Sequence, residues 1–520
     1  MSQKHLARNI SIMSIAITFS RLLGLIRDQV MAYFFGTSYL NDAFNVAYNI
    51  PNLLRRLFGE GALSASFVPI YNEIGIKKGK AHQLDFALNV LSILTLLLTF
   101  LTFIGVVFAP YIVKALYPGL EPGTTLMAVK LSRIIFPYLF FIGLSSTFIA
   151  ILNSHDYFFM TGLSSAMLNI GMVLTVMVPH MIWGLSGEQL IIWAGWGVFL
   201  GGLLQTIINL PYLKRIGYNF KVVIRFSGEA ISALWKRFIP SMIGIGIREI
   251  NLIADTLMAS FLPTGSITAL GFGNRLMQLP LGIFAISTGT AVLPLYSRYV
   301  TEHKYTELSD SLRFASVSLA CIILPITTLI ALVGKDFVII LFQHGAFGIR
   351  ATLMTYQALV LYSIGLLFYS LNQTITPLFY ANKDTKTPMY IAAVIVGLNI
   401  TLNFILMQFI QHRGLALSTS ITAMINYFLL LYLIRKKMPR VSFHKLFPNI
   451  AKALVICIVI YIPMYFVNTH IMGTGRVFLI IKDAIFSIVV FTVFFILASL
   501  LKIEYINQVR DQLWSKLLRK

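Results

Sequence analysis

Charged side chains stand inside two apolar stretches near the start of the chain. Arg21, Arg27 and Asp28 lie in the first stretch, and Asp42 and Arg55 lie in the second. Arg21 and Asp28 are seven residues apart, so on an α-helix the charges of the first stretch share one face. Guanidinium groups bind phosphate in a bidentate manner, and a charge at the middle of a membrane helix costs roughly 2.5–3.5 kcal/mol. The arrangement predicts an arginine-lined site for an anionic ligand such as a phosphate group.

The charges of the second stretch also have structural interpretations. Asp42 follows Asn41 at the start of the expected helix, where a carboxylate can serve as an N-cap. Arg56 and Glu60 are four residues apart and can form an ion pair on one helix face. In that case Arg55 is the arginine that can reach a ligand.

A further arginine, Arg275, stands in the apolar run GFGNRLMQLP, and its expected helix contains no acidic residue. An arginine without a local partner in an apolar segment indicates function, so we expect Arg275 to join the anion site. Asp255, one expected helix earlier, is the alternative structural partner. Arg248 and Glu249 are expected to form a local ion pair.

A second polar group lies mostly in the later part of the chain, at Asp255, Asn399, Asn403 and Thr419. Carboxylate, amide and hydroxyl oxygens suit a hard cation such as Na⁺. Hydrogen bonding between membrane helices is the alternative and, on residue types alone, the preferred interpretation.

Composition places these residues in a polytopic membrane protein. Of 520 residues, 57% are hydrophobic and 12% charged, and the mean hydropathy is +0.80; a soluble fold cannot bury so much apolar side chain. The net charge of +22 fits cytoplasmic loops and anionic lipid headgroups, and no nucleic-acid-binding motif accompanies it. Cys321 and Cys457 lie in apolar segments, so neither a disulfide nor a cysteine metal site is expected.

Hydropathy predicts an all-α fold with fourteen transmembrane helices. Basic residues concentrate in loops on one side, which predicts that both termini are cytoplasmic. Pro51 and Pro280 are expected to interrupt the second and eighth spans. The spans are expected near 8–35, 43–72, 85–110, 128–152, 157–181, 189–212, 234–261, 267–296, 314–341, 352–380, 387–410, 414–435, 450–468 and 477–501.

The segment GALSASFVPIY at 61–71 is echoed by STGTAVLPLY at 287–296. Chance similarity between apolar helices is one explanation, and a parallel repeat of two six-helix lobes is the other, as in many transporters. The repeat predicts an N-terminal lobe at 1–225 and a C-terminal lobe at 226–440. Residues 441–520 would then hold two additional helices and an amphipathic tail.

Four runs carry a resemblance to a known family: SRLLGLIRD, NDAFNVAYNIPNLLRRLFGEGALSASFVPIYNE, GNRLMQLP and KDTKTP. They resemble the MurJ (MviN) lipid II flippases of the MOP exporter superfamily. The resemblance implies two lobes around a central cavity, with two C-terminal helices beside a lipid-facing groove. It also implies transport, without enzymatic activity, of undecaprenyl-diphosphate-linked peptidoglycan precursor from the inner to the outer leaflet of a bacterial inner membrane.

The resemblance also implies site residues. The substrate would contact Arg21, Arg27, Arg55 and Arg275, with Ser20, Asp28, Asp42, Glu60 and Thr268 as further sensitive positions. A sodium site would fall on Asp255, Asn399, Asn403 and Thr419. Three departures from the family pattern matter: Asn274 and Asn403 stand where relatives carry acidic residues, and Asn49 stands where some relatives carry a lysine.

Other functions remain open from the residues alone. A polysaccharide flippase of the same superfamily also carries a lipid diphosphate, whereas a drug/cation exporter is expected to have an acidic cavity. A membrane enzyme acting on polyprenyl diphosphate needs acidic clusters or a nucleophile–base pair, and the nine histidines form no HExxH spacing. No cofactor is expected. Na⁺ coupling, H⁺ coupling and the membrane potential are candidate energy sources, and the cell-wall synthesis machinery is a candidate partner.

Overall fold

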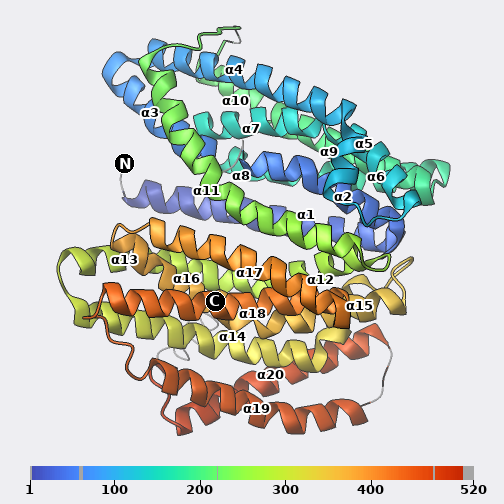
Figure 1. Ribbon diagram of the computed structural model, residues 1–520, viewed down its shortest axis with the longest axis vertical. Helices are drawn as coiled ribbons and strands as arrows, with labels where there is room; N and C mark the ends of the chain where they lie inside the picture. Colours follow the sequence, from blue (N-terminus) through green and yellow to red (C-terminus); the bar gives the residue numbers. More distant parts are fainter. Residues whose placement is uncertain (1–2, 58–61, 220, 472, 474, 507–520) are drawn as a thin grey trace. The chain divides into compact units, whose positions relative to one another are not determined.

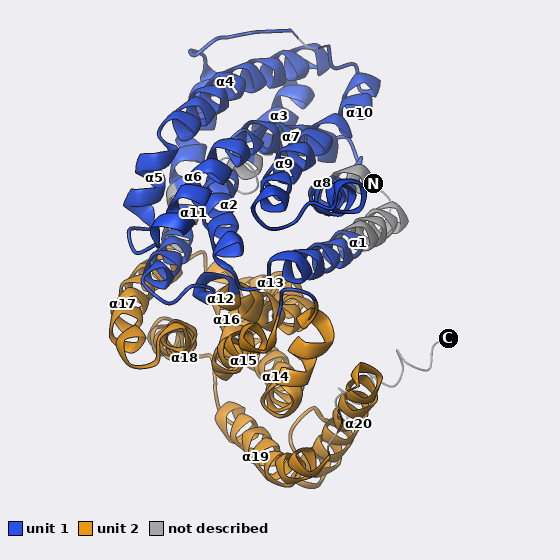
Figure 2. Ribbon diagram, turned by 90° about the vertical axis from the view of Figure 1, so that its right-hand side faces the viewer, with its two compact units in different colours: residues 1–268, 345–347 blue, residues 269–344, 348–520 orange. Residues whose placement is uncertain are grey.

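The computed structural model describes residues 3–57, 62–219, 221–471, 473 and 475–506, and it is built from α-helices (Figure 1). The chain forms two compact units (Figure 2). Unit 1 contains residues 1–268 and 345–347, and unit 2 contains residues 269–344 and 348–520. The expectation of an all-α membrane protein is confirmed. The predicted lobes, residues 1–225 and 226–440, are defined by the internal repeat and not by these two units. Their limits stay predictions.

Unit 1 contains eleven described helices and the first residues of a twelfth. They are α1 (Gln3–Phe35), α2 (Tyr39–Arg55), α3 (Ala62–Lys78), α4 (Lys80–Val107), α5 (Ala109–Leu116), α6 (Pro122–Ile135), α7 (Tyr138–Asn153), α8 (Phe158–Trp183), α9 (Gly187–Ile207), α10 (Leu210–Arg215) and α11 (Glu229–Ser260).

The helix that starts in unit 1 and continues into unit 2 is α12 (Ser266–Pro280). The remaining described elements are η2 (Leu281–Ala285), α13 (Ile286–Thr301), α14 (Tyr305–Phe342), α15 (Ile349–Ile364), α16 (Leu366–Ala381), α17 (Lys386–Ile410), α18 (His412–Lys437), α19 (Leu446–His470) and α20 (Arg476–Leu500).

Among the described residues, nine helices are long and apolar enough to cross a membrane, or eleven if each of two bent helix pairs is one span. The three other predicted spans fall on α1, on α2 with α3, and on α11. These three carry most of the charged residues singled out from the sequence, whereas Arg275 lies in one of the nine, Ser266–Thr301. The described helices are therefore consistent with fourteen spans.

The two halves of the chain use the same helix pairings. In the first half α3 packs on α4, α4 on α7, α7 on α9 and α8 on α9; in the second half α13 packs on α14, α14 on α16, α16 on α18 and α17 on α18. The bent pairs are also equivalent: α6 and α7 meet at 41°, and α15 and α16 meet at 42°. These matching pairings support the parallel repeat over chance similarity.

Interruptions of the helices have local causes. The α-helix ends at Pro280 and continues as the π-helix η2, as expected. Pro51 instead lies inside α2, which runs on to Arg55, because one missing backbone donor bends a helix without ending it. At the bend between α15 and α16, a Cβ on Gly365 would lie 2.6 Å from the Cα of Ser420. Glycine therefore permits the close approach of α18.

The loop between α16 and α17 carries Asp384 of the KDTKTP run. Its carboxylate accepts hydrogen bonds from the backbone N–H of Thr387 at 3.0 Å and from the Thr387 hydroxyl at 2.7 Å. The ammonium of Lys437, at the end of α18, donates to the same carboxylate at 2.5 Å. Asp384 thus satisfies one orphan backbone donor at the start of α17 and links that end to the end of α18.

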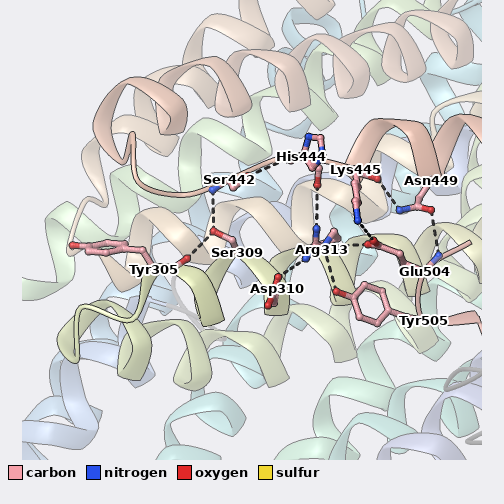
Figure 3. A network of polar contacts seen from close by, with 10 residues as sticks. All are labelled: Tyr305, Ser309, Asp310, Arg313, Ser442, His444, Lys445, Asn449, Glu504 and Tyr505. Atoms are coloured by element: carbon pink, nitrogen blue, oxygen red, sulfur yellow. Dashed lines mark hydrogen bonds and ion pairs between the residues drawn. The ribbon is translucent and has the colours of Figure 1, made fainter.

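The last two helices pack on α14 and on each other. Figure 3 shows the polar network that joins the start of α14 to the start of α19 and the segment after α20. Arg313 lies 3.3 Å from the Glu504 carboxylate and donates to Tyr505 at 3.2 Å, while Lys445 lies 3.3 Å from the other Glu504 oxygen. Residues 507–520, where an amphipathic tail is expected, lie outside the described residues.

Candidate functional site

The first charged stretch lies on α1, which packs along α8. The Arg27 guanidinium donates to one Asp28 oxygen from Nε at 3.1 Å and from Nη2 at 2.8 Å. Asp28 is buried and Arg27 is partly buried. Arg27 also interacts electrostatically with Tyr48 of α2 and Tyr138 of α7. The carboxylate therefore orients a guanidinium that faces other helices of unit 1.

Ser20 and Arg21 take different positions on the same helix. The Ser20 hydroxyl accepts a hydrogen bond from Ser165 of α8 at 3.1 Å, and its carbonyl accepts one from Asn169 at 3.1 Å. Ser20 thus belongs to the α1–α8 contact. Arg21 is exposed in unit 1, so its guanidinium is accessible to a ligand.

One interpretation of the sequence made Asp42 the N-cap of its own helix, and this interpretation is wrong. Its carboxylate, 4% exposed, accepts from the backbone N–H of Gly265 at 2.5 Å and of Thr268 at 2.9 Å. The Thr268 hydroxyl donates a third hydrogen bond at 2.7 Å, and Asn45 also donates to that hydroxyl at 3.1 Å. Asp42 therefore satisfies backbone donors at the start of α12, 226 residues further along the chain. The predicted residues Asp42 and Thr268 meet here in a structural contact.

The arginines at the end of α2 have defined partners. Arg55 donates from Nε to the side chain of Asn52 at 2.9 Å, and its contact with a ligand stays a prediction. Arg56 donates to both oxygens of Glu249 on α11 at 3.0 Å. Its predicted partner, Glu60, lies outside the described residues. Glu249, expected to pair with its neighbour in sequence, binds an arginine 193 residues away.

Arg275 lies on the part of α12 that belongs to unit 2, and its side chain is exposed. Its guanidinium carbon lies 5.8 Å from the ring centre of Phe272, within the range of a cation–π interaction. The neighbouring Asn274 accepts a hydrogen bond from Gln278. Convergence of Arg275 with the three arginines of unit 1 stays a prediction.

The residues predicted for sodium fall in both units. Asp255 belongs to unit 1, where Asn251 donates to its carboxylate at 3.5 Å. In unit 2, Asn403 donates to Asn399 at 2.8 Å and accepts from Ser418, and Asn399 donates to Thr422 at 3.2 Å. The Thr419 hydroxyl donates to the Leu415 carbonyl at 2.8 Å.

In unit 2 these side chains form hydrogen bonds between and within membrane helices. This is the alternative to sodium binding that residue types favoured. The amide oxygens of Asn399 and Asn403 already accept side-chain donors. In the described part of the chain, no group of three or more His, Cys, Asp or Glu is placed to hold a metal ion. Sodium binding therefore stays a prediction.

Sequence reasoning missed one buried ionic cluster. Lys482 of α20, 8% exposed, forms an ion pair with Asp336 of α14 and donates to Asn468 of α19 at 2.9 Å. Asn468 in turn donates to the Leu332 carbonyl at 2.9 Å. The sequence does contain an indication of this cluster, because Lys482 and Asp483 are adjacent charged residues inside the last predicted span.

Known proteins resemble this chain in sequence and in fold. The family model described as "Lipid II flippase MurJ" matches residues 31–501, which include the second charged stretch and Arg275. The probable lipid II flippase MurJ of Buchnera aphidicola subsp. Schizaphis graminum is 34% identical over 435 residues, covering 82% of this chain and 83% of the relative.

Solved structures agree with the sequence relatives. A lipid II flippase MurJ in an inward closed conformation matches with a TM-score of 0.78 and 28% identity, covering 93% of this chain and 97% of that chain. An inward-facing MATE multidrug transporter of the MOP superfamily shares the fold, with a TM-score of 0.68 and 13% identity over 83% of this chain and 98% of that chain. The expected family is therefore confirmed: the chain belongs to the lipid II flippase MurJ family.

Proposed function

We propose that the protein moves lipid II, the undecaprenyl-diphosphate-linked precursor of peptidoglycan, from the inner to the outer leaflet of a bacterial inner membrane. The observation that carries the proposal is the family match over residues 31–501. A flippase moves its lipid without changing it chemically, so the protein is a transporter and not an enzyme. No catalytic residue is assigned.

The physical problem is the passage of a diphosphate and a sugar–peptide headgroup through about 30 Å of hydrocarbon. In the proposed mechanism Arg21, Arg27, Arg55 and Arg275 bind the diphosphate, because guanidinium neutralises and hydrogen-bonds phosphate at the same time. The contact of Asp28 with Arg27 supports this role, since it fixes the direction of one guanidinium. The polyprenyl chain stays in the lipid throughout.

Movement of the two lobes about the bound headgroup would expose it to each side of the membrane in turn. Release then requires a weaker hold on the anion, for example when Arg27 interacts more closely with Asp28. With both termini in the cytoplasm, as the basic loops predict, the membrane potential supplies about 2.3 kcal/mol per charge per 100 mV. The proposal includes no sodium-dependent step.

Transport of labelled lipid II in proteoliposomes tests the proposal. We expect the wild type to move lipid II between leaflets, and Arg275→Ala to lose transport while inserting normally, because one diphosphate contact is gone. Arg275→Lys should recover only part of the rate, since lysine lacks the bidentate geometry.

Arg298→Ala is the matched control. Arg298 is an exposed arginine of α13, also in unit 2, and it pairs with Glu302 at 2.8 Å. It should transport at the wild-type rate. Wild-type protein that leaves lipid II in its original leaflet would contradict the function. Normal transport by Arg275→Ala would contradict only the assigned site.

A further inference from the structure

The last helix, α20, has one buried face with charged residues in it. Leu479, Lys482, Phe486 and Val490 recur at three- and four-residue spacing and are all buried. Asp483 is four residues from Leu479, so it borders the same face. This face packs on α14 and α19, which lie beside α20 in Figures 1 and 2. Asp483 is therefore held at a helix interface and not on an open surface.

Both carboxylate oxygens of Asp483 are buried, and in the described part of the chain neither has a hydrogen-bond partner. The nearest hydroxyl on its own helix, that of Ser487, donates to the Asp483 backbone carbonyl at 2.7 Å. An ionised carboxylate in this situation loses its hydration without gaining donors, which is unfavourable. A neutral carboxyl group avoids most of that cost.

The neighbouring charges already balance without Asp483. Lys482 is engaged by Asp336 and by the Asn468 amide oxygen, and it lies 5.9 Å from the ring centre of Phe486. One lysine and one aspartate give a net charge of zero. A second carboxylate would be attracted by Lys482 but repelled by Asp336, and Asp483 interacts electrostatically with both. The cluster thus has no cation left for an ionised Asp483.

We propose that Asp483 is a proton-binding site inside the α14–α19–α20 assembly and carries its proton at neutral pH. Loss of that proton to water leaves the cluster with one net negative charge. Lys482 then lies between two carboxylates, and its ion pair with Asp336 weakens. Proton occupancy of Asp483 therefore controls how firmly α20 is held to α14. Asp483 itself lies on α20, one of the two C-terminal helices beyond the predicted repeat, and the proposal does not depend on lipid II being the substrate.

Other titratable groups near the cluster have their own contacts. Tyr356 of α15 donates from its hydroxyl to the Ala331 carbonyl at 3.4 Å and interacts with Asp336, Tyr461 and Tyr465. His470, at the end of α19, contacts the Phe466 carbonyl at 2.8 Å, and Lys335 of α14 is exposed. Arg476, at the start of α20, donates to the Gln343 carbonyl at 2.9 Å.

Infrared spectroscopy of the full-length protein in liposomes tests the proposal. At neutral pH we expect the wild type to show a protonated-carboxyl C=O band that is lost in Asp483→Asn. Asparagine has nearly the shape of a protonated aspartate, so the variant should fold. Asp85→Asn is the matched control, because Asp85 is an exposed acid that pairs with Arg225. Its spectrum should keep the whole protonated-carboxyl band.

Equal protonated-carboxyl bands in the wild type and Asp483→Asn would overturn the proposal. A second measurement needs no variant: raising the pH of the wild type should convert the band into carboxylate absorption. A wild-type spectrum without any protonated-carboxyl band at neutral pH would overturn the proposal whether or not the variant folds.

Discussion

Asp42 and Asp483 are the same side chain in two buried helix contacts, with opposite surroundings. Asp42 in unit 1 accepts three hydrogen bonds from Gly265 and Thr268. The two oxygens of Asp483 in unit 2 receive none from the described residues. Three donors offset part of the cost of burying an ionised carboxylate, and a carboxylate without donors has nothing to offset that cost. The difference teaches that a charge in a membrane helix can hold the fold together or respond to protons, depending on its donors.

The largest effect is expected where the unit 2 cluster loses its cation. Lys482→Met should destabilise the protein by about 3–5 kcal/mol, because the mostly buried carboxylate of Asp336 is left without its partner. Unfolding in detergent, followed by circular dichroism, measures the change. The double variant Lys482→Met with Asp336→Leu should recover most of the loss. No recovery would mean that Lys482 acts through packing instead of charge.

Asp42→Ala should cost about 2–4 kcal/mol, because two backbone N–H groups at the start of α12 lose their acceptor. Asp42→Asn should lose roughly half as much, since it keeps one acceptor oxygen. Asp483→Asn should leave the unfolding midpoint at neutral pH unreduced. If Asp42→Asn and Asp483→Asn behaved alike in the same unfolding assay, the contrast between the two carboxylates would be wrong.

Asp384 lies outside the membrane spans, and the expected effect of replacing it is smaller than that of replacing Asp42. Partial burial by itself raises the pKa of Asp384, but hydrogen bonds from Lys437 and Thr387 outweigh it and lower the pKa to about 2. Asp384→Ala should cost about 1 kcal/mol at neutral pH through loss of the cap of α17. Because the folded-state pKa is depressed, this contribution is present above the unfolded pKa of about 3.9 and is lost as the pH falls toward 2.

Thermal unfolding of Asp384→Ala and wild type at several pH values checks that window. The difference between their midpoints should be constant from pH 7 to about pH 5 and should shrink below about pH 4. A difference that persisted undiminished at the lowest pH would show that the carboxylate charge is not what stabilises this loop.

The smallest effect is expected for Glu302, an exposed carboxylate beyond the end of α13. Hydrogen bonds from Lys304 and Arg298 lower its pKa to about 2. Glu302→Gln should nevertheless leave the unfolding midpoint unchanged, because water and salt screen an exposed ion pair. The measurement is the same thermal scan at low and high salt. A clear loss of stability at high salt would show that exposure is a poor guide to the importance of these carboxylates.

Patterns local in sequence predicted local features of the fold well. Apolar segments of about twenty residues located the helices, and Pro280 located the interruption of the eighth span. The contact between Arg27 and Asp28 joins neighbours on one helix. Pairings between distant segments were missed, because spacing along a helix cannot show which other helix will pack against it.

An all-α membrane protein of a lipid flippase family could be recognised before any coordinates, since hydropathy, loop charges and motifs are properties of the chain alone. Three contacts could be seen only in the folded chain: Asp42 binds the start of α12, Arg56 pairs with Glu249, and Lys482 pairs with Asp336. They were not predictable because a charge in a membrane must find a partner in three dimensions. Helix packing brings together partners that lie 146 to 226 residues apart.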